Sequence, residues 1–147
     1  MDNSRKVHLA LNVTDVNRSV EFYRAVFGSN PVKWKPGYAK FDVAEPPLNL
    51  SLNQQAKVAG GGALSHLGIE VSSSEEVLAA KDRLRQAGLT TADEMNVDCC
   101  FALQDKTWIT DPDGNRWEIF TVKIEDTQPE LIAEQAHVSS KQACCQS

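Results

Sequence analysis

Apolar and polar residues alternate in two segments of the chain that share one pattern. The segments HLALNV (residues 8–13) and HLGIEV (residues 66–71) both follow the pattern H-L-x-(L/I)-x-V, and the second begins 58 residues after the first. A period of two in a short run of aliphatic residues predicts a β-strand. Repetition of that strand predicts a chain built from two similar modules.

After each of the two strands, apolar residues recur with the period of an α-helix. Thr14 or Asp15 can cap the first helix, and Ser73 and Glu76 have the spacing of a capping box at the start of the second. A glycine ends each helix, at residues 28 and 88. The expected apolar faces are Val16, Val20, Tyr23 and Phe27 in the first helix, and Val77, Ala80, Leu84 and Ala87 in the second.

Short strand-like runs, separated by turn residues, come after each helix. They are residues 32–34, 38–43 and 48–52 in the first half, and 90–95, 101–104, 107–110 and 116–122 in the second. The segment DPDGN (residues 111–115) predicts a hairpin, because Asp-Gly accommodates positive φ angles. The fold class is therefore α+β, with two repeated βαβββ modules.

Length and charge limit the classes of protein that fit. The 147 residues suffice for a single domain over residues 1–122, with module one at about 6–53, a linker at 54–63 and module two at about 64–122, followed by a flexible polar tail at 123–147. A net charge of −5 argues against nucleic acid as a partner. We expect neither a signal peptide nor a membrane span, and hence a cytoplasmic location in which thiols stay reduced.

The two histidines of the repeated motif, His8 and His66, occupy equivalent positions in the two modules. Such positions tend to meet near the axis that relates the modules, so both histidines are expected to enter one cavity. Glu118 lies between Trp117 and Ile119 in a strand, where a carboxylate is either exposed or, if buried, paired or coordinated. Two histidines and one carboxylate suit non-haem Fe(II) working with O₂, although Mn²⁺ and Zn²⁺ accept similar ligands.

These features resemble the vicinal oxygen chelate superfamily of glyoxalases, bleomycin-binding proteins and dioxygenases. The resemblance covers about residues 6–122 and rests on the paired modules, the HL-x-(L/I)-x-V strand starts and the hairpin DPDGNRWEIF (residues 111–120). It implies that the two modules form an open, cupped, mixed sheet around a metal site. The implied partner is a small molecule, and the modules pair either within one chain or between the chains of a homodimer.

Within this superfamily, NVDCC (residues 96–100) and PGYAKFDVAEPPLNLSL (residues 36–52) are similar to the organoarsenical carbon–arsenic lyases. That similarity implies an Fe(II)-dependent dioxygenase, with O₂ as co-substrate, acting in arsenic detoxification. Its substrates would be trivalent organoarsenicals, such as methylarsonous acid or reduced aromatic arsenicals, and its product arsenite. By the same similarity, His8, His66 and Glu118 would hold Fe(II), and Cys99 and Cys100 would bind arsenic.

The adjacent cysteines fit this role chemically, because soft trivalent arsenic prefers thiolates to carboxylate or imidazole. Neighbouring residues of a regular strand point to opposite faces, so we expect the chain to leave strand geometry at residues 98–100. For Phe101, Gln104 and Lys106, near this pair, a structural role is favoured over a role in a pocket or lid. The second pair, Cys144 and Cys145, either relays arsenicals to the site or belongs to a dispensable tail, which is the favoured alternative.

Three other functions remain open at this point. A thiol-dependent enzyme of the glyoxalase or fosfomycin-resistance type shares much of the ligand set, and so does an extradiol dioxygenase that acts on catechols. A non-catalytic protein that sequesters a drug or an arsenical is the alternative from a different class. Iron content, measured together with oxygen-dependent release of arsenite, separates catalysis from sequestration.

Overall fold

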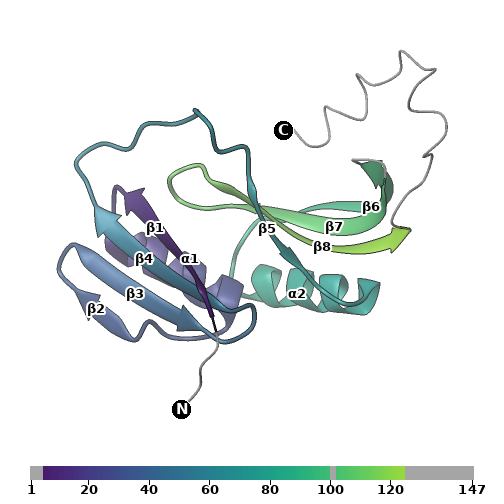
Figure 1. Cartoon of the computed structure of the whole chain (residues 1–147), viewed down its shortest axis with the longest axis horizontal. Coiled ribbons are helices and arrows are strands. Elements are labelled where there is room, and N and C mark those ends of the chain that lie inside the picture. Colours follow the sequence, from purple (N-terminus) through teal and green to yellow (C-terminus); the bar gives the residue numbers. More distant parts are fainter. Residues whose placement is uncertain (1–4, 100–101, 125–147) are drawn as a thin grey trace. The chain divides into compact units, whose positions relative to one another are not determined.

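A computed structural model describes residues 5–99 and 102–124 of the chain (Figure 1). The first module consists of β1 (Val7–Val13), α1 (Val16–Phe27), β2 (Lys33–Lys35), β3 (Tyr38–Val43) and β4 (Leu48–Gln54). The second module consists of β5 (Leu67–Glu70), α2 (Ser74–Gln86), β6 (Ala92–Cys99), β7 (Ala102–Thr110) and β8 (Arg116–Ile124). The predicted pair of βαβββ modules is confirmed.

Each module forms its own four-stranded mixed sheet. The strand orders are β1-β4-β3-β2 and β5-β8-β7-β6, so the first strand of each module lies beside the last. Both of these pairs are parallel, and β2–β3, β3–β4 and β6–β7 are antiparallel. The same connectivity in both modules confirms the internal repeat and the α+β class.

The chain divides into two compact units, Met1–Gly60 with Thr110–Asn115 and Gly61–Ile109 with Arg116–Ser147. The DPDGN turn therefore belongs to the first unit. Within that unit, the hydroxyl of the fully buried Tyr23 donates a hydrogen bond to Asp111 over 2.6 Å, and Asp111 also accepts from the amides of Asp113 and Asn115. Gly114 has a φ of 92°, as expected for the Asp-Gly turn.

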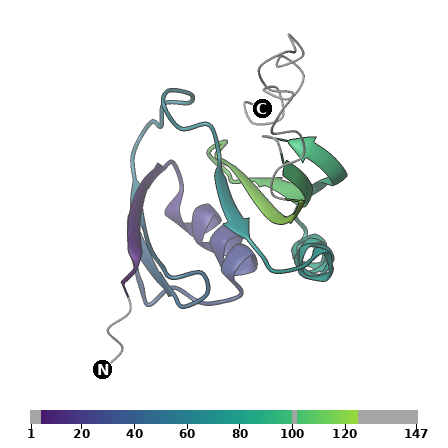
Figure 2. The same cartoon turned by 45° about the vertical axis from the view of Figure 1, so that its right-hand side comes forward.

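Helix α1 covers one face of the first sheet by packing against β3 and β4 (Figure 2). Asp15 caps the helix by accepting hydrogen bonds from two backbone amides, and Gly28 ends it with a φ of 63°. Along β1, Leu11 and Val13 are buried, whereas His8 is exposed. Since strand residues alternate between faces, His8 lies on the face that α1 does not cover.

Helix α2 packs against β8 in the second unit. Ser73 caps it and accepts a hydrogen bond from the amide of Glu76, and the Glu76 carboxylate accepts hydrogen bonds from the amide and the hydroxyl of Ser72. Those hydrogen bonds from Ser72 hold the pKa of Glu76 below its usual value. The expectation that Ala87 belongs to the apolar face is wrong, because the helix ends at Gln86 and Ala87 is its exposed C-cap.

Two predicted strands of the second module, residues 101–104 and 107–110, form one continuous strand, β7. The predicted strands leave out the charged pair Asp105-Lys106, but both residues are 98% buried and both have partners. Asp105 accepts a hydrogen bond from Ser74 of α2, and Lys106 donates one to Glu118 of β8. Paired charges are tolerated inside a sheet, so the strand continues through them.

A β-bulge interrupts the pairing of β6 with β7. Met95 and Asn96 together oppose Asp105, between the pair Glu94–Lys106 and the pair Val97–Gln104. Asn96 has a φ of 53°, in the left-handed region that asparagine tolerates better than most residues. Its amide donates to Asp105 over 2.7 Å, and its side chain accepts from Lys123 over 2.6 Å.

The bulge corrects the expected position of the irregularity in β6. The strand continues through Asp98 and Cys99, which pair with Leu103 and Ala102, so the predicted departure is wrong for residues 98 and 99. It occurs instead at residues 95–96. The remaining cysteines, Cys100, Cys144 and Cys145, lie outside the described residues. In the part of the chain that the structure describes, every helix is too short or too polar to cross a membrane.

Candidate metal centre

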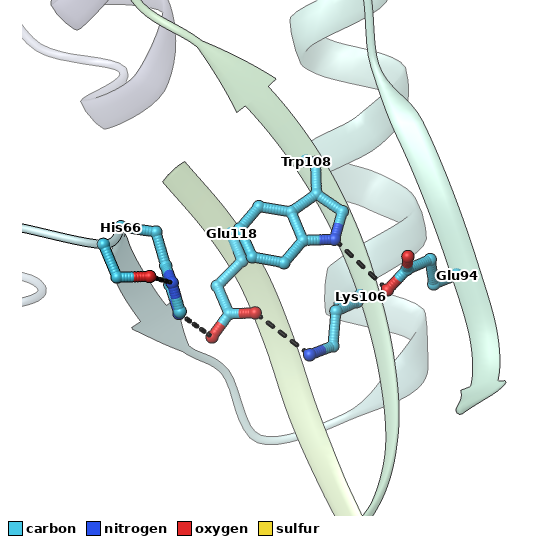
Figure 3. A network of polar contacts seen from close by, with 6 residues as sticks. His66, Glu94, Lys106, Trp108 and Glu118 are labelled. Atoms are coloured by element: carbon cyan, nitrogen blue, oxygen red, sulfur yellow. Dashed lines mark hydrogen bonds and ion pairs between the residues drawn. The ribbon is translucent and has the colours of Figure 1, made fainter. Parts of the chain in front are cut away.

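Two of the predicted metal ligands, His66 and Glu118, face each other in the second unit (Figure 3). His66 comes directly before β5, and Glu118 lies in β8, which pairs with β5 in parallel so that Gly68 is opposite Glu118. The imidazole Nε2 of His66 is 3.6 Å from Oε1 of Glu118. The strand pairing therefore brings together an imidazole and a carboxylate that are 52 residues apart in the sequence.

His66 is oriented by its other ring nitrogen. A hydrogen bond of 2.9 Å joins Nδ1 of His66 to Oγ of Ser65. The ring also meets the indole of Trp108 edge to face, with centroids 5.2 Å apart. Contacts of this kind on the far nitrogen typically fix the orientation of a metal-binding histidine, and here they leave Nε2 directed toward Glu118.

Glu118 is buried, and its two oxygens have different neighbours. Oε1 faces His66, whereas Oε2 accepts a hydrogen bond from Nζ of Lys106 over 3.1 Å. A Cβ atom placed on Gly68 would lie 3.1 Å from Cγ and 3.3 Å from Oε1 of Glu118. The absence of a side chain at Gly68 thus leaves the space that the carboxylate occupies.

Trp108 forms the apolar part of the centre on β7. Its Nε1 donates a hydrogen bond to Glu94 over 3.2 Å, as Figure 3 shows. The Arg116 guanidinium lies 4.3 Å and the Lys106 ammonium 5.5 Å from the centre of the Trp108 ring, within the range of cation–π contacts. These contacts on both the ring and its nitrogen hold Trp108 beside His66.

The donor atoms of this pair fit a divalent transition metal. Nitrogen and oxygen ligands lie about 2.0–2.2 Å from such an ion, so two ligands of one ion are roughly 3.0–3.4 Å apart. The 3.6 Å between His66 and Glu118 is close to that spacing. Over the described residues, neither unit by itself gathers three metal-ligating side chains. His8 belongs to the first unit, so its role as the third ligand remains a prediction.

The bulge in β6 determines the register of the predicted arsenic ligand Cys99. In the backbone pairing, Cys99 is opposite Ala102 and Val97 is opposite Gln104. Ala102 and Gln104 belong to the same alternate set of β7 positions as Lys106 and Trp108. Without the extra residue in β6, position 99 would fall in the other set. The roles of Cys99 and Cys100 in binding arsenic remain predictions, and Cys100 lies outside the described residues.

Asp105 fixes this bulge from the face of the sheet opposite to Lys106 and Trp108. Burial raises the pKa of Asp105, but hydrogen bonds from Ser74 and Asn96 and the charge of Lys123 outweigh it, so the pKa lies below its usual value. The pKa of Asp93, on the same face as Asp105, is also below its usual value. Burial raises this pKa, but the hydrogen bonds from Lys81 and Thr107 outweigh the effect of burial. Two anchored carboxylates thus connect α2 to the strands that carry the centre.

The sequence pattern missed several residues that shape the centre. For Lys106 the sequence favours a general structural role over a role in a pocket or lid, and it predicts no role for Ser65, Gly68 or Trp108. One signal was present for Gly68, which stands in HLGIEV where the first copy of the repeat has alanine. A glycine at this place in the repeat is consistent with the close approach of Glu118 to the strand.

The fold, the repeat and the facing His66–Glu118 pair define a class of protein. The family model of the Glyoxalase/Bleomycin resistance protein/Dioxygenase superfamily matches residues 5–119. This chain belongs to that superfamily. A crystal structure of a glyoxalase/bleomycin resistance protein/dioxygenase from Alicyclobacillus acidocaldarius has the same fold, with a TM-score of 0.68, 16% identity, and coverage of 87% of this chain and 99% of its own.

Curated relatives with higher sequence identity include an enzyme that cleaves organoarsenicals and a cadmium-induced protein. The chain is 48% identical over 143 residues to the trivalent organoarsenical cleaving enzyme of Bacillus sp. (strain MD1), which covers 94% of this chain and 88% of that enzyme. It is 50% identical over 117 residues to the cadmium-induced protein CadI of Mycobacterium tuberculosis (strain ATCC 25618 / H37Rv), covering 80% of this chain and 76% of that protein. The resemblance to the carbon–arsenic lyases is confirmed as sequence similarity.

Proposed function

We propose that this protein is an Fe(II)-dependent dioxygenase that cleaves the carbon–arsenic bond of trivalent organoarsenicals. The observation that carries the proposal is the His66–Glu118 pair, 3.6 Å apart, in a chain 48% identical to a trivalent organoarsenical cleaving enzyme over nearly its whole length. The pair supports a metal, and the relative's name supports the substrate class. His8 is the proposed third ligand.

The thiols of Cys99 and Cys100 hold the substrate. An organoarsenical R–As(OH)₂ exchanges its two hydroxyl groups for the two sulfurs, which releases two molecules of water and leaves the As–C bond intact. Adjacent cysteines chelate at little entropic cost, because the second thiol is already tethered beside the first. Reduced thiols are needed for this step, and we therefore also propose a cytoplasmic location.

His66, Glu118 and His8 would hold the iron, and a ferrous ion in that place supplies the activation of O₂. For a methyl substrate the balance is CH₃As(OH)₂ + O₂ → HCHO + As(OH)₃. The methyl carbon loses four electrons and O₂ gains four, while arsenic stays trivalent. The chain itself orients both reactants, and orientation accounts for a large share of catalysis in such sites.

Substitutions made separately at the thiols and at the metal site test the proposal. Cys99→Ser and Cys100→Ser each remove one sulfur, so both variants should lose turnover of methylarsonous acid by at least about a hundredfold while they bind Fe(II) as the wild type does. Glu118→Gln is the matched variant, which should lose iron and keep stoichiometric binding of the arsenical. Normal turnover in either serine variant would contradict the proposed role of the thiols.

A non-catalytic arsenical-binding protein is the second candidate. The observation in its favour is the 50% identity to a protein named only as cadmium-induced, a name that carries no catalytic activity. A sequestering protein would bind one arsenical per chain and release no arsenite when Fe(II) and O₂ are both supplied.

A further inference from the structure

Lys106 is a cation buried within the second unit. Only 2% of the residue is exposed, and its Nζ donates to Oε2 of Glu118 over 3.1 Å. Burial of an ammonium group is costly unless an opposite charge accompanies it. Trp108 lies beside it, Glu94 is its backbone partner on β6, and Lys106 forms an ion pair with Glu118.

The contact with Lys106 divides the Glu118 carboxylate between two neighbours. Lys106 holds Oε2, and Oε1 is left facing Nε2 of His66 (Figure 3). The space above Gly68 accepts the carboxylate in this orientation and would not accept an added methyl group without a shift. The carboxylate therefore presents one oxygen to the imidazole, while Lys106 holds the other.

We propose that Lys106 is a positioning residue of the metal centre, which holds Glu118 in a one-oxygen orientation and supplies the positive charge that faces this carboxylate before a metal binds. The inference rests on the proposed metal-binding role of His66 and Glu118. Neither the description of the superfamily nor the names of the relatives assign a function in metal binding to Lys106.

Opposite effects on metal binding and on turnover follow from this role. An ammonium group and a divalent cation that share one carboxylate repel each other, so Lys106 stabilises the metal-free protein and weakens metal affinity. This repulsion outweighs the entropy of ordering one glutamate side chain. Without Lys106, Glu118 is free to direct both oxygens toward the metal and to occupy a position that O₂ or substrate needs.

The test uses the full-length chain, Co(II) as the probe metal, and the variant Lys106→Met, which removes the charge and keeps most of the side-chain volume. Metal-free Lys106→Met should melt at a lower temperature than the wild type, and Co(II) should raise its Tm by more. Its Kd for Co(II), measured by calorimetry, should be about tenfold lower than that of the wild type, whereas turnover per bound Fe(II) should fall about tenfold or more.

Lys81→Met is the matched control, because it removes a lysine that pairs with Asp93 over 2.6 Å on the helix-covered face of the same sheet. It should lower the Tm with and without Co(II) by the same amount and leave the Kd unchanged. Equal or weaker Co(II) binding by Lys106→Met, with no larger rise in Tm than in the wild type, would overturn the proposal. Unchanged turnover would equally overturn the orienting role.

A double variant keeps the test valid if metal-free Lys106→Met does not fold. Lys106→Met with Glu118→Gln has no unpaired buried charge, so it should be more stable than Lys106→Met alone in the absence of metal. A double variant that is no more stable than the single one would overturn the proposal. Failure of wild-type protein to bind Co(II) would instead refute the proposed metal centre, whatever the stability of these variants.

Discussion

At the scale of single residues, the candidate centre depends on small differences in space and charge. Gly68 leaves room for the Glu118 carboxylate, and Lys106 holds one of its oxygens so that the other faces His66. The approach of His66 and Glu118 to each other could be predicted from the sequence, because one recurs in a repeat and the other is a carboxylate in an apolar strand. The contact with Lys106 could not, since it depends on the register between β7 and β8.

Gly68→Ala tests the steric part of this arrangement. The new Cβ would lie 3.1 Å from Cγ of Glu118 and 3.2 Å from Cε1 of Phe120, so the carboxylate has to shift. We expect an about tenfold weaker Kd for Co(II) and a loss of about 1–3 kcal/mol in the free energy of unfolding. Calorimetry and urea denaturation measure the two effects.

Gly60→Ala is the control for that substitution, because nothing lies within 4 Å of its added Cβ and its φ is not positive. It should leave both the Co(II) affinity and the stability near those of the wild type. Wild-type Co(II) affinity in Gly68→Ala would show that Glu118 does not need this space.

At the scale of secondary-structure elements, hydrophobic periodicity predicted the helices and most strands, and buried charges account for the errors. The predicted strands stop on either side of Asp105-Lys106, but each of these charges has a partner on a neighbouring element and β7 continues through them. The bulge at residues 95–96 was also not predicted. A bulge follows from pairing with a distant strand, here through Asp105, and leaves no periodic signal in its own strand.

Asp105→Asn tests how far this carboxylate anchors the bulge to α2. The pKa of Asp105 is lower in the folded protein than its ordinary value, so the carboxylate stabilises the fold above about pH 4, and this stability is lost as the pH falls through the folded-state pKa. At pH 7 the variant should lose about 1–3 kcal/mol of unfolding free energy. The difference from the wild type should shrink at pH 3.

Urea denaturation at pH 7 and at pH 3 measures this difference. Asp82→Asn, an exposed substitution on the same helix α2, is the control and should change the stability little at either pH. A loss in Asp105→Asn that is as large at pH 3 as at pH 7 would show that the charge of Asp105 does not contribute.

At the scale of the whole molecule, the internal repeat was the most informative feature of the sequence. It predicted two modules of the same connectivity, and the structure has that connectivity in both sheets. The repeat also led to the superfamily, which the match over residues 5–119 establishes. The proposed roles of His8 as third ligand and of Cys99 and Cys100 as arsenic ligands rest on the sequence, because His8 belongs to the other unit and Cys100 lies outside the described residues.

The most direct test of the proposed function is oxygen-dependent release of arsenite. Anaerobically reduced protein is loaded with one Fe(II) per chain and methylarsonous acid, and a measured amount of O₂ is then admitted. The proposed balance predicts that arsenite and formaldehyde appear in equal amounts, with one O₂ consumed for each, and that none forms without O₂ or in Glu118→Gln. Arsenical that remains bound and unchanged after O₂ is admitted to iron-loaded protein would contradict the proposal.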